Sequence, residues 1–183
     1  MSQATVEGDV VRALEAGDPS LAVTSALRSY GPELVSYLRS VLGDPDGAVE
    51  TYAQVCENAW KGISLYRREG SFRGWLYGIA YRAAQDYRRD GFRRRVRRLE
   101  TGEISALVAQ ARSSLRPDRQ HERAAQMEDV LAQLGAEERS MVLLRVARGM
   151  SWKEVARVLG DDEAAVRKRF QRLRNRVRDL LQG

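Results

Sequence analysis

Apolar residues spaced three and four positions apart are the feature of this sequence that most limits its fold. The clearest block begins after Ser71, a good helix N-cap, and follows the i, i+3, i+4, i+7 rule of a helix face. Its members are Phe72, Trp75, Leu76, Ile79, Ala80, Ala83 and Tyr87. A second block is Leu34, Tyr37, Leu38, Val41 and Leu42. Strand-like alternation is not seen in any part of the sequence, so we predict an all-α fold.

Gly, Pro and Asp mark where these helices begin and end. Asp18-Pro19 and Asp44-Pro45 each place an N-cap before a Pro at the first helical position. Gly17 and Gly43 suit the left-handed position that follows a helix. We also expect Gly31-Pro32 to break the helix that starts at Pro19.

The C-terminal part has the pattern of a helix-turn-helix. Ser151 and Glu154 form a capping box, Gly160 ends that helix, and Asp161-Asp162 cap the last one. The last helix is expected to expose Arg167, Lys168, Gln171, Arg172, Arg174, Asn175 and Arg178. Arg and Gln suit base edges in the major groove, and the other cations suit phosphates. The alternative is a helical hairpin with a solvated basic face.

The mixture of Tyr and Arg on the helix after Ser71 predicts that this helix contacts unpaired bases. We expect its second face to be exposed and to carry Arg73, Tyr77, Tyr81, Arg82, Gln85 and Arg88. Rings and guanidinium groups stack on exposed bases, and cations follow the phosphates. Seven Arg also fall within residues 88–98. The alternative is a core helix with a solvated charged end.

The net charge of +6 is unevenly distributed. Residues 1–60 hold three Arg against nine Asp and Glu, a balance of −6, so the remainder carries +12. This asymmetry indicates a protein partner for the acidic part and nucleic acid for the basic part.

Other residue patterns exclude several classes of protein. The single cysteine, Cys56, lies on an apolar helix stripe and fits a buried thiol in a reducing compartment. The only histidine, His121, has no cluster of metal-ligand residues around it, and no Gly-rich phosphate loop follows a strand. We therefore expect no enzyme activity, metal or cofactor. The N-terminal residues lack a basic segment followed by an apolar one, so we expect no signal peptide, and no apolar run is long enough to cross a membrane. We expect a cytoplasmic protein without membrane insertion.

Linker chemistry divides the chain into two domains. Ser113-Ser114 and Pro117-Asp118 lie in a less regular stretch, in which Ile104, Leu107 and Val108 fit a short helix. We assign residues 1–98 to one helical domain, 99–123 to a tether and 124–183 to a second helical domain.

Several motifs, in their order, resemble a bacterial RNA polymerase sigma factor of the extracytoplasmic-function (ECF) type, which keeps region two and region four. The segments that carry the resemblance are VVRALEAGDPSLAVTSALRSY (10–30), SFRGWLYGIA (71–80) with Asp86 and Arg88-Arg89, Leu143-Leu144-Arg145, GMSWKEVA (149–156), and VRKR (166–169) with Arg172. The resemblance covers nearly the whole chain apart from the tether.

The resemblance implies roles for particular residues. Docking on the clamp of the polymerase's largest subunit would use Glu50, Gln54, Glu57 and Asn58. Capture and melting of the promoter's minus-ten element would use Leu65, Tyr66, Arg67, Ile79, Arg82, Arg88 and Arg89. Reading of the minus-thirty-five element would use Lys153, Arg167, Lys168, Gln171 and Arg172. The family also implies contact with the flap of the second-largest subunit, a monomeric free state, an anti-sigma protein and association with the nucleoid during initiation.

The chain departs from the family pattern in three places. Residues 50–54 read ETYAQ where the family often has Asp-Leu-x-Gln-Glu, Arg82 replaces a frequent Asn, and Ala165 and Lys168 replace a Thr and a Ser. We therefore expect altered clamp contacts and a promoter preference of its own. Two other functions fit the residues: a helix-turn-helix regulator that binds duplex DNA without polymerase, and a helical protein whose basic faces bind an acidic partner.

Overall fold

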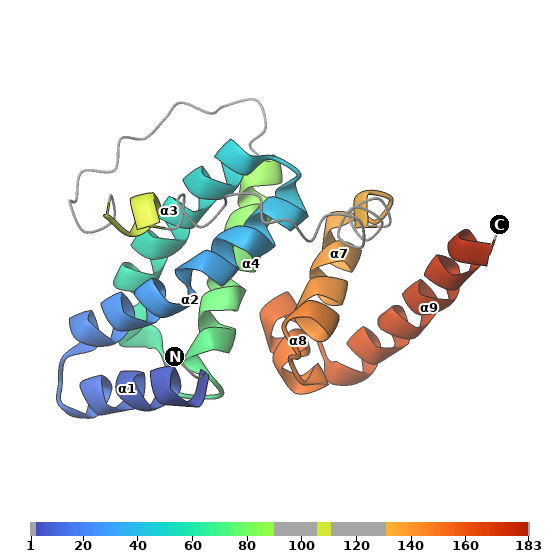
Figure 1. The fold of residues 1–183 in the computed structure, drawn as a ribbon. Helices are drawn as coiled ribbons and strands as arrows, with labels where there is room; N and C mark the ends of the chain where they lie inside the picture. The colour runs from blue at the N-terminus through green and yellow to red at the C-terminus, as the bar shows by residue number, and fades with distance from the viewer. Residues whose placement is uncertain (1–2, 90–105, 111–130, 183) are drawn as a thin grey trace. The chain divides into compact units, whose positions relative to one another are not determined.

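The computed structural model describes residues 3–89, 106–110 and 131–182. Over these ranges the chain is helical, with short turns and no strand, which confirms the all-α prediction (Figure 1). The chain divides into two compact units, Met1–Arg116 and Pro117–Gly183. Each unit has its own core.

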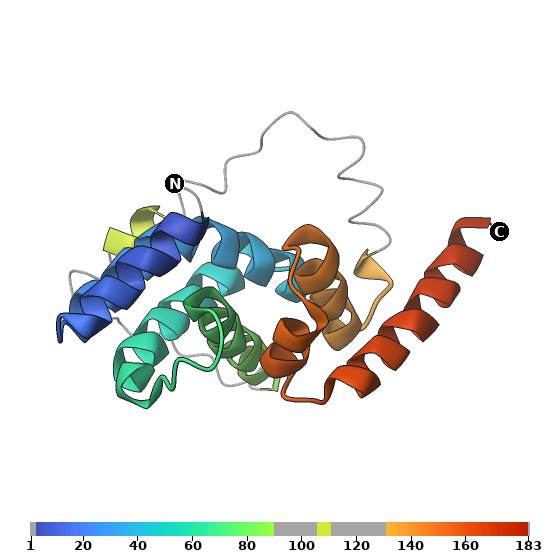
Figure 2. The same ribbon diagram turned by 90° about the horizontal axis from the view of Figure 1, so that it is seen from below.

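The first unit is a helical bundle around α2. Its described elements are α1 (Gln3–Glu15), α2 (Pro19–Leu42), α3 (Pro45–Gly62), the 3-10 turn η1 (Ile63–Leu65) and α4 (Phe72–Arg89). Helix α2 packs against α1, α3 and α4, and α3 also packs against α4 (Figures 1 and 2). The core contains fully buried aromatic side chains, Tyr37, Tyr52, Phe72 and Tyr77, together with leucines of α2 and α4. Their burial supplies the main stabilisation of this unit.

The helix starts follow the local sequence signals. Asp18 accepts a hydrogen bond from the N–H of Leu21 at 2.8 Å, and Asp44 accepts one from Gly47 at 3.0 Å. Gly43 has φ +67°, the left-handed conformation that ends α2. These predictions are confirmed.

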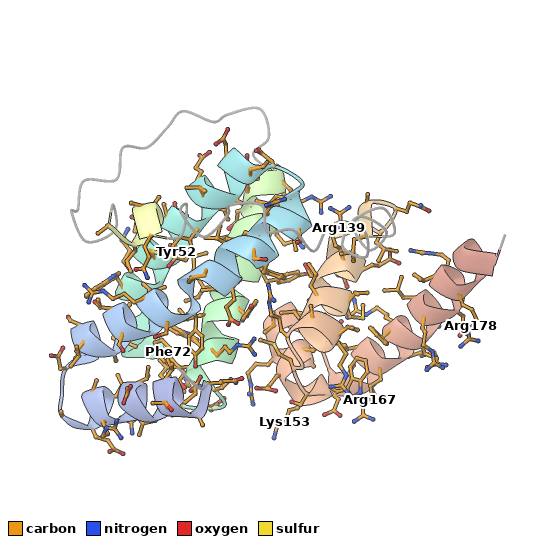
Figure 3. All side chains as sticks on the ribbon, in the orientation of Figure 1. Tyr52, Phe72, Arg139, Lys153, Arg167 and Arg178 are labelled. Carbon is orange, nitrogen blue, oxygen red and sulfur yellow. The ribbon has the colours of Figure 1, made fainter. Side chains whose placement is uncertain are left out.

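The predicted break at Gly31-Pro32 is wrong, because α2 continues through both residues. Pro32 cannot donate to the carbonyl four residues earlier, which normally weakens a helix interior. Here α3 packs closely at the same place. The hydroxyl of the buried Tyr52 (Figure 3) donates to the carbonyl of Leu27 at 3.1 Å, and a Cβ on Gly31 would lie 2.5 Å from that hydroxyl. Gly31 therefore leaves room for α3 and does not end the helix.

The second unit contains the predicted helix-turn-helix. Its described elements are α7 (Ala136–Val142), the π turn η2 (Leu143–Ala147), α8 (Trp152–Leu159) and α9 (Glu163–Gln182). Leu144, Val155 and Val166 are fully buried where these helices meet.

The capping signals of the second unit are also confirmed. The hydroxyl of Ser151 accepts from the N–H of Glu154 at 3.3 Å, and the carboxylate of Glu154 accepts from the N–H of Ser151 at 2.9 Å. Gly160 has φ +74°, and Asp162 accepts from the N–H of Ala164 at 2.8 Å at the start of α9. Local capping signals therefore define the start of α8 and both ends of the turn between α8 and α9.

Part of the sequence prediction falls outside the described residues. In the tether assigned to residues 99–123, residues 106–110 are helical and Leu107 is buried. The rest of the tether, with His121, and the arginines at 93–98 lie outside. Among the described helices, none is both long and apolar enough to cross a membrane. Within the same ranges, no group of three or more His, Cys, Asp and Glu side chains has the arrangement of a metal site.

Candidate nucleic-acid interface

Helix α9 presents a basic outer face. All seven residues predicted there are exposed: Arg167, Lys168, Gln171, Arg172, Arg174, Asn175 and Arg178. Figure 3 shows Arg167 and Arg178 extending outward from α9, and Lys153 extending from the first turn of α8. This face therefore offers guanidinium, ammonium and amide donors, the groups that contact phosphates and major-groove base edges.

Two other arginines of α9 face α7 instead. Arg169 pairs with Glu137 and Asp161, and Arg176 pairs with Glu138 at 2.6 Å. The acidic first turn of α7 thus pairs with one side of α9. The basic residues of this helix therefore fall into an outward set and a set that pairs with acidic residues of α7 and of the turn before α9.

Arg167 is held by its neighbours within the helix-turn-helix. Its Nε donates to the carboxylate of Glu163 at 3.0 Å, and its guanidinium lies 5.9 Å from the ring centre of Trp152. Arg145 lies 4.7 Å from the same ring, and Phe170 contacts that ring edge to face at 4.9 Å. These cation–π and ion-pair contacts restrict the rotamers of Arg167 before any ligand binds.

The loop between η1 and α4 presents an exposed leucine beside an anchored tyrosine. Leu65 is 78% exposed, and Arg67 is also exposed. The ring of Tyr66 packs against Phe72 and Trp75, with ring centres 5.0 and 5.3 Å apart, and its hydroxyl donates to the carbonyl of Gly70 at 3.0 Å. An exposed apolar side chain next to cations can insert between unstacked bases.

Helix α4 exposes less of its second face than the sequence predicted. Arg82, Arg88 and Arg89 are exposed, and Tyr81 and Gln85 are half-buried. Ile79, predicted to help capture the minus-ten element, is only 6% exposed and belongs to the core. Direct contact between Ile79 and a base is therefore not supported.

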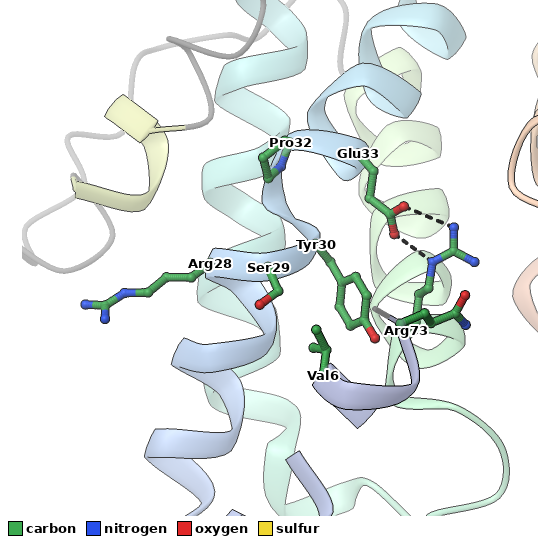
Figure 4. Close-up of a pocket in the computed structure, with 8 residues that line it drawn as sticks. Val6, Arg28, Ser29, Tyr30, Pro32, Glu33 and Arg73 are labelled. Atoms are coloured by element: carbon green, nitrogen blue, oxygen red, sulfur yellow. Dashed lines mark hydrogen bonds and ion pairs between the residues drawn. The ribbon is translucent and has the colours of Figure 1, made fainter. Parts of the chain in front are cut away.

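Arg73 and Tyr77 were also predicted on the exposed face, and both are buried. Arg73 forms a two-point ion pair with Glu33 of α2, beside a surface pocket of about 510 Å³ that both residues line (Figure 4). Burial alone would lower the pKa of Arg73, but the hydrogen bonds and charge of Glu33 outweigh burial and raise it. The Tyr77 ring packs edge to face on Tyr37, with ring centres 5.2 Å apart. Both side chains stabilise the bundle.

The residues predicted to meet the polymerase form a polar strip along one face of α3, at positions i, i+4, i+7 and i+8. Glu50 is exposed, and Gln54, Glu57 and Asn58 are half-buried. The amide of Gln54 donates to Glu57 at 3.2 Å and to Asn58 at 3.1 Å, and Lys61 pairs with Glu57. The structure therefore places all four predicted side chains on one face.

Glu7 makes long-range contacts that no sequence pattern indicated. Its carboxylate accepts hydrogen bonds from the backbone N–H groups of Phe72 and Arg73, both at 2.9 Å, and from the hydroxyl of Tyr30 at 3.1 Å. Burial, and then the negative charge of Glu7, raise the pKa of Tyr30. Because its partners are far away in the sequence, no local pattern around Glu7 indicates them.

Both units match models of known protein families. The family model of Sigma-70 region 2 matches residues 26–95, and that of Sigma-70 region 4 matches residues 124–177. Together they cover more than half of the chain. Over 186 aligned residues the chain is 29% identical to the ECF RNA polymerase sigma factor SigD of Mycobacterium tuberculosis, covering 96% of this chain and 85% of SigD. The chain is an ECF sigma factor of the sigma-70 family. Sigma factors are non-enzymatic initiation factors that direct RNA polymerase to promoters.

Two solved structures share the fold of this ECF sigma factor. CnrH, solved in complex with the cytosolic domain of CnrY, has a TM-score of 0.65 at 24% identity, covering 95% of this chain and 97% of that one. The sigma factor RpoE of Bartonella quintana, solved with the anti-sigma factor NepR, has a TM-score of 0.57 at 19% identity, covering 88% and 93%. At sequence identities of 24% and 19%, the similarity to these two structures shows a shared fold only.

Proposed function

We propose that this ECF sigma factor holds a promoter at two elements with its two units. Residues 1–98 bind core polymerase and the melted minus-ten element, residues 124–183 read the minus-thirty-five duplex, and residues 99–123 connect them. The proposal is carried by one observation: the two compact units expose different binding chemistry. The first unit exposes the apolar side chain of Leu65 beside arginines, and the second exposes hydrogen-bond donors along the outer face of α9.

In the second unit, α9 enters the major groove of the minus-thirty-five element. Arg167 and Gln171 have donors that suit base edges, and the exposed Lys168 and Arg172, on an adjacent face of the helix, hold phosphates. Lys153, exposed at the start of α8, adds a phosphate contact. The contacts of Arg169 and Arg176 with α7 leave this face to the outward residues.

In the first unit, the loop at residues 65–67 meets unpaired bases of the minus-ten element. Leu65 and Tyr66 supply apolar contact and Arg67 supplies charge, while Arg82, Arg88 and Arg89 of α4 follow the phosphates. Removing a base from the stack costs on the order of a few kcal/mol, which these contacts must offset. Ile79 acts only through packing, because it is buried.

The polar strip of α3, formed by Glu50, Gln54, Glu57 and Asn58, docks on the clamp of the polymerase's largest subunit. The negative balance of residues 1–60 supports a protein partner here. The second unit contacts the flap of the second-largest subunit. The free sigma factor is a monomer in the cytoplasm and joins the nucleoid during initiation. Because RpoE was solved with an anti-sigma factor, we also propose an anti-sigma partner for this chain.

Run-off transcription with added core polymerase tests this function. Wild-type sigma factor should join core polymerase as a monomer and make it start at defined positions, which are then mapped. The alternative regulator would shift duplex DNA alone, without polymerase. Failure to bind core polymerase, or random start sites, would contradict the proposal.

A further inference from the structure

The start of α4 is held by a residue of α1. The N–H groups of the first three residues of a helix have no partner within the helix and need one elsewhere. In α4 the N–H groups of Phe72 and Arg73 each donate to one oxygen of Glu7, and that of Gly74 donates to the hydroxyl of Ser71 at 3.0 Å. Glu7 thus caps α4 from another helix, with its negative charge at the positive end of the α4 dipole.

Glu7 is itself fixed in place from α2. The hydroxyl of Tyr30 donates to the same Glu7 oxygen that binds the N–H of Arg73. The Arg73 side chain pairs with Glu33 of α2. The backbone and side chain of Arg73 are therefore bound to two carboxylates from two different helices.

Phe72 connects this cap with the loop at residues 65–70. Its N–H binds Glu7, and its fully buried ring packs edge to face against Tyr66. Tyr66 in turn holds Gly70 through its hydroxyl and stands next to the exposed Leu65. A shift of the first turn of α4 would therefore move the surface under Tyr66.

We infer that Glu7 is a positioning residue for minus-ten recognition: through the α4 N-terminus it sets the conformation of the loop that meets the unpaired bases. This inference rests on the proposed role of that loop. The inference gives α1 a role in promoter recognition, although α1 lies outside the residues that match Sigma-70 region 2.

The test measures binding of holoenzyme to a single-stranded oligonucleotide that carries the minus-ten sequence from the mapped start sites. Fluorescence anisotropy gives the dissociation constant. Glu7→Ala should weaken binding about tenfold, the size expected for losing a charged helix cap. Glu7→Gln, which keeps one acceptor oxygen, should lose less. Asp9→Ala is the matched control, because Asp9 also lies on α1 but its carboxylate pairs with Arg12 of the same helix.

A double-mutant cycle separates positioning from general stability. If Glu7 acts through the loop, adding Glu7→Ala to Tyr66→Ala should weaken binding by less than about twofold. Affinity for core polymerase should stay unchanged in every variant, with all measurements made below the onset of thermal unfolding. Unchanged oligonucleotide binding by Glu7→Ala, or additive losses in the double variant, would overturn the inference.

Hydrogen exchange provides a readout that does not depend on Glu7→Ala folding. In the wild-type free protein, the amides of Phe72 and Arg73 should be protected, and in Glu7→Gln they and the amides of residues 66–70 should exchange faster. Exchange of the Phe72 and Arg73 amides at the unprotected rate in the wild type would overturn the inference. Failure of the wild-type chain to join core polymerase would instead overturn the proposed function on which it rests.

Discussion

The guanidinium of Arg73 grips the carboxylate of Glu33 at two points, with Nε–Oε1 at 2.7 Å and Nη2–Oε2 at 3.0 Å (Figure 4). The pair joins the first turn of α4 to the middle of α2. Only 9% of the Arg73 side chain and 28% of the Glu33 side chain are exposed, so water screens the pair weakly. Among the cationic side chains, only the planar guanidinium of Arg can donate to both oxygens of a carboxylate in this way.

Arg73→Met should destabilise the first unit by about 2 kcal/mol. Removing one partner of a fully buried pair costs about 3–5 kcal/mol, and the partial exposure of Glu33 reduces that value. Urea denaturation followed through the indole NMR signals of Trp60 and Trp75 measures the first unit alone. Arg28→Met is the control, since Arg28 is an exposed arginine of α2. Equal losses in both variants would contradict a structural role for the pair.

Gly31→Ala should destabilise the first unit by about 1–3 kcal/mol, because the new methyl group would lie 2.5 Å from the Tyr52 hydroxyl. The same denaturation experiment applies. Tyr52→Phe removes the clashing oxygen, so the double variant should lose less than the sum of the two single variants. Additive losses would mean that Gly31 is needed for another reason.

Lowering the pH should reduce the stability of the second unit, because the carboxylate of Glu138 becomes protonated. The hydrogen bond from Arg176 lowers the pKa of Glu138, burial opposes this, and the N–H of Gly135 adds to the lowering. The carboxylate therefore contributes stability above its unfolded pKa, and the contribution is lost as the pH falls through the lower folded pKa. Thermal unfolding between about pH 5 and 3, followed through Trp152, should show a smaller loss in Glu138→Gln than in wild type. Parallel pH curves would refute this linkage.

The two faces of α9 should behave differently in transcription. Arg172→Ala should lower promoter-specific run-off about tenfold and reduce the salt slope of promoter binding by about one, because it removes an outward cation. Arg167→Ala should act in the same direction. Arg176→Ala, which loses the contact with Glu138, should leave the salt slope unchanged. Core polymerase affinity should be the same in all three variants. Loss of polymerase binding together with transcription would argue against separate tasks for the two units.

Tyr66→Ala should slow opening of duplex promoters more than use of pre-melted ones. The variant loses ring contacts with Phe72 and Trp75 on which the shape of the loop depends. Tyr66→Phe keeps these contacts and loses only the bond to Gly70, so its defect should be smaller. The measurement is the rate of open-complex formation on matched templates. Identical defects on both templates would count against a role in melting.

Helix boundaries were predictable where the signal is local. Asp18, Asp44 and Ser151 cap helices as their sequences indicated, because each side chain reaches a backbone N–H three residues on. Gly31-Pro32 misled the sequence analysis because the outcome depends on Tyr52, which belongs to another helix. Propensity alone cannot include such a neighbour.

The exposed residues of α9 were predictable because only one side of that helix packs against its unit. Helix α4 differs, since α1, α2 and α3 all contact it. Periodicity gives the direction of a buried stripe but not its width, so Arg73 and Tyr77 were predicted to be exposed and lie within the core. Periodicity put Ile79 on the buried stripe, where it lies, and only the family resemblance implied that it contacts DNA. The bonds from Glu7 to α4 could not be predicted either, because their partners are separated by more than sixty residues.

The carboxylate of Glu163 beside Arg167 has a consequence for DNA of the wrong sequence. A random genomic site offers that arginine only backbone phosphates, whose charge also repels the acid on the preceding turn. If Arg167 reads a base edge as proposed, a donor–acceptor match at the correct site would offset the separation of Arg167 from Glu163. The carboxylate of Glu163 at the N-terminus of the basic helix α9 should therefore shorten the residence time on unrelated DNA. More of the protein then stays free to search for its promoters.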